Sequence, residues 1–307
     1  HEFFHIVTPL SVHSEEIHSF DFNTPKMSKH LWMYEGITEY FANLFQVNQG
    51  LISEQEFINA MEGKIKASMR FDDKMSFTEM SKNILDKKYA SNYGNVYQKG
   101  ALIGMSLDII LREESKGTYG VRNLMLDLSK KYGATKAFKD DELLSEIVQM
   151  TYPAVGEFFK NHLEGTTPID YKTLLAKTGV ITKKKTVNTR YFIDNSNQPY
   201  ITVNPKREII FMAKTNSGLA ALGVKANDVL KKVNGEDFTL QTANTIIVKT
   251  FSWKAGDKIS LDIIRDGKPM KLEGTAIVPK AEVVGMVIED LPADNPKAML
   301  RKAWLKG

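Results

Sequence analysis

The 307-residue chain contains no cysteine, and this absence excludes disulfides, thiolate zinc sites, iron–sulfur clusters and a cysteine nucleophile. Long apolar runs are also lacking: stretches such as Ala101–Met105 are far shorter than the roughly 20 residues that a membrane helix needs. Charge of one sign does not dominate either, with 41 Lys+Arg against 37 Asp+Glu. The basic residues are spread along the chain and mixed with acidic ones, so we expect no nucleic-acid partner. Because the apolar runs are short, we also expect no transmembrane segment.

What the chain does contain is typical of a globular protein that buries a core: 42% hydrophobic, 25% charged and 10% aromatic residues. Its length predicts two domains rather than one. The absence of cysteine fits a periplasmic or cell-envelope location slightly better than the cytoplasm, which stays open as the alternative. Residue 1 is histidine and not methionine, so we expect the sequence to begin inside a longer gene product.

Residues 1 to about 178 are predicted to be mainly helical. Ser53, with Glu56 three residues later, predicts a capping box at a helix start. Gly50 predicts the stop of the preceding helix, and Pro153 separates two later ones because proline is excluded from a helix interior. Apolar residues at helical spacing predict further helices over Leu31–Val47, Val96–Leu111, Leu124–Tyr132, Asp140–Met150 and Val155–His162.

Beyond residue 180 the pattern is typical of strands. The cationic run Lys183-Lys184-Lys185 is predicted to be a solvated linker. Asp266-Gly267 predicts a two-residue hairpin turn. Strands are predicted at Tyr191–Ile193, Tyr200–Val203, Glu208–Ala213, Val229–Val233, Lys258–Arg265 and Met270–Ala276, with helices at Gly218–Leu222, Leu240–Thr250 and Pro296–Leu305. We expect about 95 of these residues to form a small barrel or sandwich with its own core.

The first five residues, His1-Glu2-Phe3-Phe4-His5, form an H-E-x-x-H pattern. On a helix, positions i and i+4 lie one above the other, so both imidazoles face one point and can bind one metal ion. Glu2 lies beside them, near enough to act on water at the metal without being a ligand. The alternative is that the pattern arises by chance and leaves two exposed histidines on a frayed terminus.

A catalytic zinc site needs a third protein ligand and one open position. Residues 30–40 supply a carboxylate, Glu35, on a second amphipathic helix. Glu39 lies one turn beyond Glu35 and could orient a ligand histidine, although it could equally be plain helix surface. His13, His18 and His30 are expected to lie at the surface or to form hydrogen bonds, because a catalytic zinc leaves no vacancy for them.

Three blocks of sequence carry a family resemblance. Trp32, followed by Glu35-Gly36 at a helix start downstream of H-E-x-x-H, resembles the glutamate-zincin metallopeptidases. The long gap after His5, which contains Phe20-Asp21-Phe22, resembles the glycyl aminopeptidase family within that clan. Tyr97-Gln98-Lys99-Gly100 resembles the Tyr-x-Lys-Gly helix of the same clan. The resemblance implies that the chain is N-terminally truncated, with a sheet before the zinc helix left out.

The same resemblance implies roles for five residues. His1, His5 and Glu35 would be the ligands of Zn²⁺. Glu2 would take a proton from water and pass it to the leaving amine. Tyr97 would donate a hydrogen bond to the oxyanion of the tetrahedral intermediate.

A second resemblance lies in the C-terminal part. Ser217–Leu230, with Val233-Asn234-Gly235, resembles the core signature of bacterial PDZ domains. Asn227 stands where a glycine usually precedes the aspartate, and asparagine also tolerates a left-handed turn. PDZ domains bind extended peptides by strand addition, so the resemblance implies a peptide or protein ligand here in addition to a peptide or protein substrate.

Together these observations predict a multidomain protein of the α and β class. A mostly helical, thermolysin-like catalytic domain over residues 1–180, the helical part of a zinc metallopeptidase, would be followed by a β-rich PDZ domain over 186–280 and a C-terminal tail over 281–307. The resemblance implies a zinc-dependent peptidase, an aminopeptidase that releases small N-terminal residues such as Gly or Ala. The alternative, from a different class, is a non-catalytic PDZ peptide-binding protein with an incomplete or vestigial zinc site.

Overall fold

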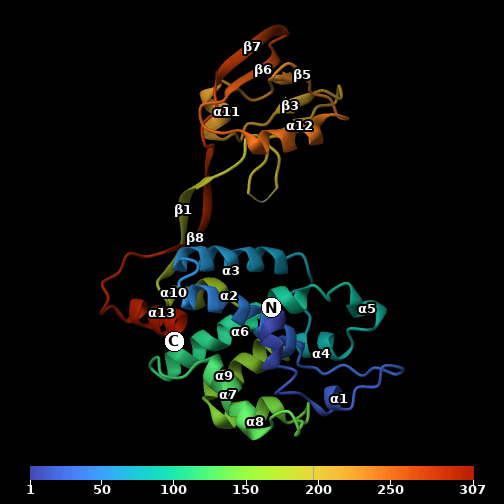
Figure 1. Cartoon of the computed structure of the whole chain (residues 1–307), viewed down its shortest axis with the longest axis vertical. Coiled ribbons are helices and arrows are strands. Elements are labelled where there is room, and N and C mark those ends of the chain that lie inside the picture. The colour runs from blue at the N-terminus through green and yellow to red at the C-terminus, as the bar shows by residue number, and fades with distance from the viewer. Residues whose placement is uncertain (196) are drawn as a thin grey trace. The chain divides into compact units, whose positions relative to one another are not determined.

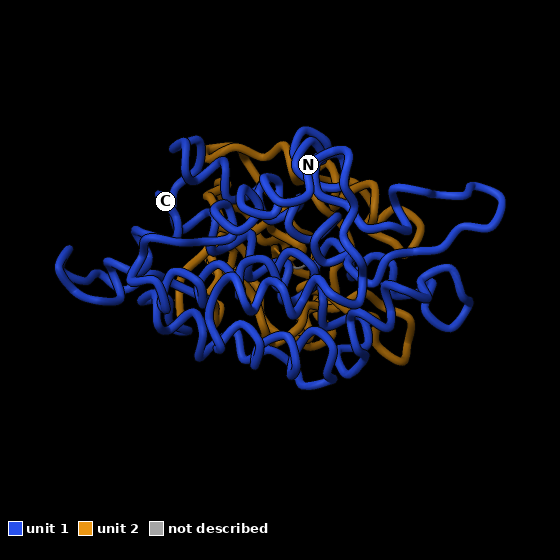
Figure 2. Tube along the Cα trace, turned by 90° about the horizontal axis from the view of Figure 1, so that it is seen from below, with its two compact units in different colours: residues 1–183, 286–307 blue, residues 184–285 orange. Residues whose placement is uncertain are grey.

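Helices predominate in one part of the chain, and strands predominate in another (Figure 1). The computed structural model describes residues 1–195 and 197–307. Unit 1 comprises residues 1–183 and 286–307, and unit 2 comprises residues 184–285 (Figure 2). The first boundary lies close to the expected one at residue 180, whereas residues 286–307, expected in a separate tail, return to unit 1. The prediction of a multidomain protein of mixed helices and strands is confirmed.

Unit 1 is helical, as predicted, and its elements are η1 Glu2–Ile6, α1 Glu15–His18, η2 Trp32–Ile37, α2 Thr38–Asn48, α3 Glu54–Ser68, α4 Phe77–Lys82, α5 Lys87–Ala90, α6 Asn95–Glu114, α7 Val121–Lys131, α8 Leu143–Met150, α9 Pro153–Phe158, η3 Phe159–Leu163, α10 Tyr171–Ala176 and α13 Pro296–Lys306. The short helices α1, α4, α5 and α10 were not predicted, because a helix of four to six residues is too short to reveal a periodic pattern of apolar residues. Helix α6 is buried on most sides and forms the centre of the unit. In the described part of the chain, no helix combines the length and the apolar character needed to cross a membrane.

In unit 1, several helices start and end at residues whose local chemistry favours that position. Ser53 and Glu56 form the predicted capping box, each satisfying a backbone amide of the other. Gly50 follows α2 with φ +72°, the left-handed conformation that glycine adopts without strain. Pro153 is the first residue of α9, where its missing amide hydrogen leaves no bond unmade.

Three predicted helices differ in type from the expectation, and one of them is Val155–His162, whose second half lies in the π-helix η3 Phe159–Leu163. Residues 32–37, expected in one α-helix through residue 47, form the π-helix η2, and the α-helix begins only at Thr38. The H-E-x-x-H segment forms the 3₁₀ helix η1, in which Phe4 N–H donates to the His1 carbonyl and Val7 N–H to the Phe4 carbonyl. Periodicity of apolar residues separates these helix types poorly, because the distinction depends on tertiary contacts.

Helices η2 and α6 touch through two glycines. A Cβ atom on Gly36 would lie 2.4 Å from the carbonyl carbon of Gly100, and one on Gly100 would lie 2.9 Å from the Cα of Gly36. Both distances are below any normal carbon–carbon contact, so the two backbones approach this closely only because neither residue has a side chain. Gly36 directly follows Glu35 on η2, and Gly100 lies three residues after Tyr97 on α6. The contact between the two glycines therefore sets the distance between Glu35 and Tyr97.

The C-terminal helix α13 is part of the core of unit 1. Trp304 on this helix is 1% exposed, and its ring packs edge to face on Phe57 with centroids 5.6 Å apart. Its Nε1–H donates to the Tyr40 hydroxyl at 2.8 Å, and that hydroxyl donates to Asp108 Oδ2 at 2.6 Å. The other oxygen of Asp108 accepts from the Val121 amide at 2.9 Å. This chain of hydrogen bonds joins α13 to α2, α6 and the start of α7.

Unit 2 is built on one antiparallel sheet with strand order β2-β3-β4-β6-β7, and β5 pairs with β4. Its elements are β2 Ile201–Val203, β3 Ile209–Phe211, α11 Ser217–Ala221, β4 Val229–Val233, β5 Glu236–Asp237, α12 Ala243–Lys249, η4 Thr250–Ser252, β6 Lys258–Arg265 and β7 Lys268–Thr275. Asp266 and Gly267 have φ +50° and +76° and close the predicted hairpin, with Arg265 opposite Lys268. A core separate from that of unit 1 supports the sheet.

Two predictions for the strand-rich part are wrong. The segment Tyr191–Ile193 is not a strand but makes one isolated bridge, between Ile193 and Pro199. The run Lys183-Lys184-Lys185 is not a linker, because it lies in β1 Val180–Asn188, which pairs with β8 Lys280–Ile288 in a two-stranded sheet. Lys183 and Lys184 are exposed, as expected, and Lys185 is partly exposed. Exposed side chains also occur on a two-stranded ribbon that has little core to cover.

Candidate metal and catalytic site

The three residues expected to bind metal lie together at the start of the chain and on η2. The His1 and His5 rings have centroids 4.9 Å apart and meet edge to face. Glu35 Oε2 lies 3.2 Å from His1 Nε2 and 3.8 Å from His5 Nε2. The two imidazole nitrogens and the carboxylate oxygen therefore converge, although η1 is a 3₁₀ helix rather than an α-helix.

The donor set and its spacing fit a zinc ion. Two histidine nitrogens and one glutamate oxygen are a known ligand set of catalytic zinc, with the fourth position left open. Ligand atoms about 2.0–2.1 Å from a tetrahedral zinc lie roughly 3.3 Å from one another. The separations of 3.2 and 3.8 Å from Glu35 Oε2 to the two nitrogens are close to this value.

Glu2 reaches the same centre. One ligand atom each of His1, Glu2 and His5 lies within 4.8 Å of the others. Two carboxylates therefore approach the imidazoles, and their surroundings distinguish them: Glu35 is half-buried beside both Nε2 atoms, whereas Glu2 is exposed. This arrangement suits Glu35 to a ligand role and leaves Glu2 in contact with solvent water.

The remaining ring nitrogens of both histidines are held by oxygen atoms. His1 Nδ1 lies 2.8 Å from Glu39 Oε2, and His5 Nδ1 lies 3.0 Å from the carbonyl oxygen of Thr8. Donation of the Nδ1 proton to these oxygens leaves each Nε2 with a free lone pair for a metal. Of the two interpretations of Glu39, the geometry favours the orienting role. Sequence analysis missed Thr8, because a backbone carbonyl leaves no sequence signal.

Tyr97 lies beside Glu35, at the start of α6. Its ring centroid is 5.5 Å from that of His1, and its hydroxyl lies 3.2 Å from the Tyr93 hydroxyl. Burial raises the pKa of Tyr97 well above its ordinary value, and the Tyr93 hydroxyl and the Glu35 charge act in the same direction. The phenol is therefore a neutral hydrogen-bond donor at physiological pH.

Burial also raises the pKa of Glu35, against the opposing influence of His5 and of the nearby Tyr97 hydroxyl. The positive charge near the carboxylate is thus too small to offset the effect of burial on its pKa. A divalent cation beside Oε2 would supply that charge and favour the ionised form. This electrostatic setting agrees with the donor geometry.

The other histidines of unit 1 form hydrogen bonds, as predicted. His30 is buried, accepts from Trp32 Nε1 at 3.1 Å through Nδ1 and lies 2.8 Å from the Asp140 carbonyl through Nε2. Burial lowers the pKa of His30. His13 Nε2 lies 2.9 Å from His18 Nδ1. Both ring nitrogens of His13 and of His30, and Nδ1 of His18, are thus engaged in protein contacts.

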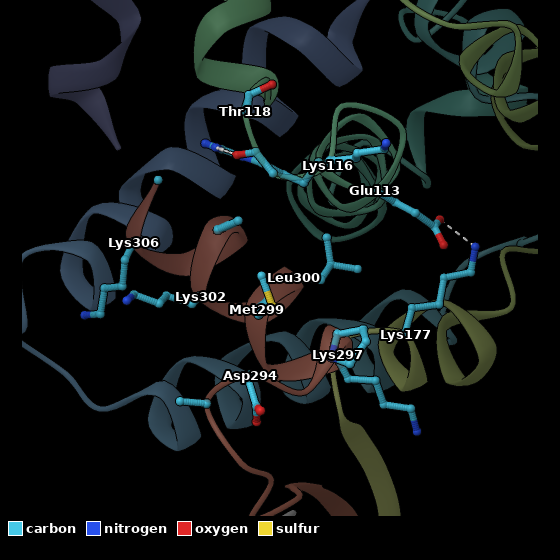
Figure 3. Close-up of a pocket in the computed structure, with 16 residues that line it drawn as sticks. Glu113, Lys116, Thr118, Lys177, Asp294, Lys297, Met299, Leu300, Lys302 and Lys306 are labelled. Atoms are coloured by element: carbon cyan, nitrogen blue, oxygen red, sulfur yellow. Dashed lines mark hydrogen bonds and ion pairs between the residues drawn. The ribbon is translucent and has the colours of Figure 1, made fainter.

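A hollow of about 1270 Å³ lies elsewhere, between α13 and the C-terminal end of α6 (Figure 3). Lysine side chains dominate its rim, and Lys177 forms an ion pair with Glu113 at 2.6 Å. Among the described residues that line it there is no histidine, and none of the five residues with expected catalytic or metal-binding roles. The candidate metal-binding and catalytic side chains therefore lie at the His1–Glu35 centre and not in the hollow.

Comparison with known proteins gives a family match for the part of the chain that holds this centre. Residues 1–103 match the family model described as M61 glycyl aminopeptidase. A crystal structure of an aminopeptidase N family protein from Idiomarina loihiensis is similar in fold, with a TM-score of 0.60 at 22% sequence identity. The similarity covers 99% of this chain and 53% of that one, so the chain spans about half of that structure. No curated protein matches. The family match supports a peptidase.

Proposed function

We propose that this chain is a zinc-dependent peptidase whose metal ligands are His1, His5 and Glu35. One observation carries the proposal: the Nε2 atoms of both histidines face a single oxygen of Glu35 at 3.2 and 3.8 Å. The contacts of the two Nδ1 atoms with Glu39 and with the Thr8 carbonyl support the proposal, because they orient both rings toward the Glu35 oxygen.

Each residue around the centre has a separate role in peptide hydrolysis. When bound, zinc supplies Lewis-acid chemistry, polarising the substrate carbonyl and lowering the pKa of water. Glu2 takes a proton from the attacking water and donates it to the leaving amine. Tyr97 donates its phenol proton in a hydrogen bond to the carbonyl oxygen as negative charge develops there. Glu39 and the Thr8 carbonyl hold the two imidazoles in place.

For the substrate we propose peptides from which small N-terminal residues such as Gly or Ala are released. The description of the matching family and the name of the similar structure support an aminopeptidase. The residues that would recognise a free α-amine belong, in the family that the chain resembles, to the sheet before the zinc helix.

For unit 2 we propose a PDZ domain that binds an extended peptide or protein segment. The turn before β4 supports this: Asn227 has φ +66°, the left-handed conformation for which glycine is the usual residue. Asp228 in the same turn pairs with Arg265 at 2.7 Å and accepts from the Lys225 amide at 2.8 Å. Both bonds hold the loop between α11 and β4.

Zinc content tests the proposal directly. We expect elemental analysis of purified, dialysed protein to give about one zinc per chain, lost in Glu35→Ala and retained in Glu2→Gln, because only the former removes a ligand. Glu15→Ala, which removes an exposed carboxylate outside the site, is the control and should retain zinc. Wild-type protein without zinc would contradict the proposal and favour the non-catalytic peptide-binding protein.

Tyr97→Phe is expected to lower kcat on a Gly- or Ala-initiated peptide by about 10²–10³-fold, the usual loss when one oxyanion donor is removed. Zinc content should stay at the wild-type level, because Tyr97 is not a ligand. Tyr119→Phe removes a hydroxyl that bonds to Asp127 at 3.0 Å outside the site, and it should leave kcat unchanged. Equal kcat values for wild type and Tyr97→Phe would exclude Tyr97 from catalysis.

A further inference from the structure

We propose that Lys64 is a positioning residue of the metal site, acting on His1 through Glu39. The inference rests on the proposed zinc function and adds to it a residue outside the motifs that predicted the site. Lys64 lies on α3, near the middle of a helix that contributes no ligand. Its Nζ is 2.6 Å from Glu39 Oε1, while the other oxygen of Glu39 is 2.8 Å from His1 Nδ1.

Each Glu39 oxygen has its own partners. Oε1 accepts from Lys64 Nζ and, at 3.3 Å, from Asn43 Nδ2, whereas Oε2 faces His1. An ammonium on one oxygen therefore leaves the second oxygen directed at the imidazole. Without that ammonium, Oε1 would keep the weaker amide contact with Asn43, and the carboxylate would be held less firmly toward His1.

The setting makes this ion pair stronger than one at the surface. The side chains of Lys64 and Glu39 are 12% and 23% exposed, so water and salt screen their attraction less than that of an open pair. Hydrogen bonds between two charged groups are also shorter and stronger than neutral ones. The pair joins α3 to α2, and thereby holds the Glu39 carboxylate from a different helix.

The effect reaches the metal through the ring of His1. A carboxylate that accepts the Nδ1 proton fixes the ring orientation and raises the basicity of Nε2. Lys64 should therefore contribute to zinc affinity without contacting zinc. Lys66 offers a matched comparison: two positions along α3, it pairs with Glu62 at 2.6 Å, but its side chain is 57% exposed and does not contact Glu39.

The test measures the zinc Kd of the full chain by competition with a chromogenic chelator. Lys64→Met is expected to raise Kd about tenfold, at the lower end of the range for outer-shell substitutions, because Glu39 remains. Lys64→Arg keeps a cationic donor and should stay within about threefold of wild type. Lys66→Met should change Kd by less than about twofold, because Lys66 pairs with Glu62 and has no contact with Glu39.

A double-mutant cycle separates action through Glu39 from general damage. Glu39→Gln alone should raise Kd about 10–100-fold, and adding Lys64→Met to it should cause no further increase. An unchanged Kd in Lys64→Met, with a lower free energy of unfolding, would overturn the inference and make the pair a plain link between α2 and α3. Additive effects would overturn it as well. Failure of wild-type protein to bind zinc would instead overturn the proposed function, and this inference with it.

Discussion

Gly36→Ala is expected to lower the free energy of unfolding of unit 1 by about 3 kcal/mol or more. The added methyl carbon would lie 2.4 Å from the carbonyl carbon of Gly100, and backbone atoms of a buried helix cannot rotate aside as a side chain can. Helices η2 and α6 would have to separate, and this would move Glu35 away from Tyr97. Because η2 carries Glu35, its displacement would also move this carboxylate relative to His1 and His5, so we expect loss of zinc affinity together with loss of stability.

Gly63→Ala is the matched control. Gly63 lies within α3, and a Cβ atom there meets nothing within 4 Å, so alanine should leave stability unchanged or raise it by up to about 1 kcal/mol. Urea unfolding followed by tryptophan fluorescence in a Trp253→Phe background reports on unit 1, because Trp32 and Trp304 both lie there. Gly36→Ala with wild-type stability would show that the two backbones are not in contact.

Trp304→Ala is expected to cost about 3–5 kcal/mol of stability, the usual range for truncation of a large buried aromatic residue. It would leave a cavity beside Phe57 and remove the hydrogen bond from Nε1 to the Tyr40 hydroxyl. The milder Trp304→Phe keeps most of the ring volume and should cost about 1–2 kcal/mol, chiefly through the lost hydrogen bond.

Met299→Ala on the same helix is the control for Trp304→Ala. Met299 is 57% exposed, so its truncation should change stability by less than about 0.5 kcal/mol. Urea unfolding monitored by far-UV circular dichroism would measure all three variants, since unit 1 holds most of the helices. Equal midpoints for Trp304→Ala and Met299→Ala would mean that α13 is not part of the core.

Short-range patterns predicted much of this molecule. Capping by Ser53, the hairpin at Asp266-Gly267 and the start of α9 at Pro153 each depend on the chemistry of a few adjacent residues, and the structure has all three. Glu35 and Tyr97 could be connected with His1 only by resemblance, because their meeting depends on a contact between helices far apart in sequence.

Long-range features escaped prediction for physical reasons. The lysines of β1 resemble a linker in composition, and only the pairing with β8, about 100 residues later, makes them a strand. Lys64 lies on a helix whose charges all look solvated, and its contact with Glu39 depends on how α3 packs on α2. The π-helical form of η2 likewise reflects its surroundings, since periodicity alone predicts an α-helix.

The return of α13 to unit 1 has a consequence for the order of events during synthesis. Unit 2 is one uninterrupted segment, residues 184–285, and it can fold as soon as it leaves the ribosome. Unit 1 lacks Trp304 until α13 Pro296–Lys306 emerges, so its core stays incomplete while unit 2 is being made. At about 5–20 residues per second this delay amounts to roughly 5–20 s. During that interval the nascent helices, with Tyr40 and Phe57 uncovered, are the segment that most needs protection by a chaperone.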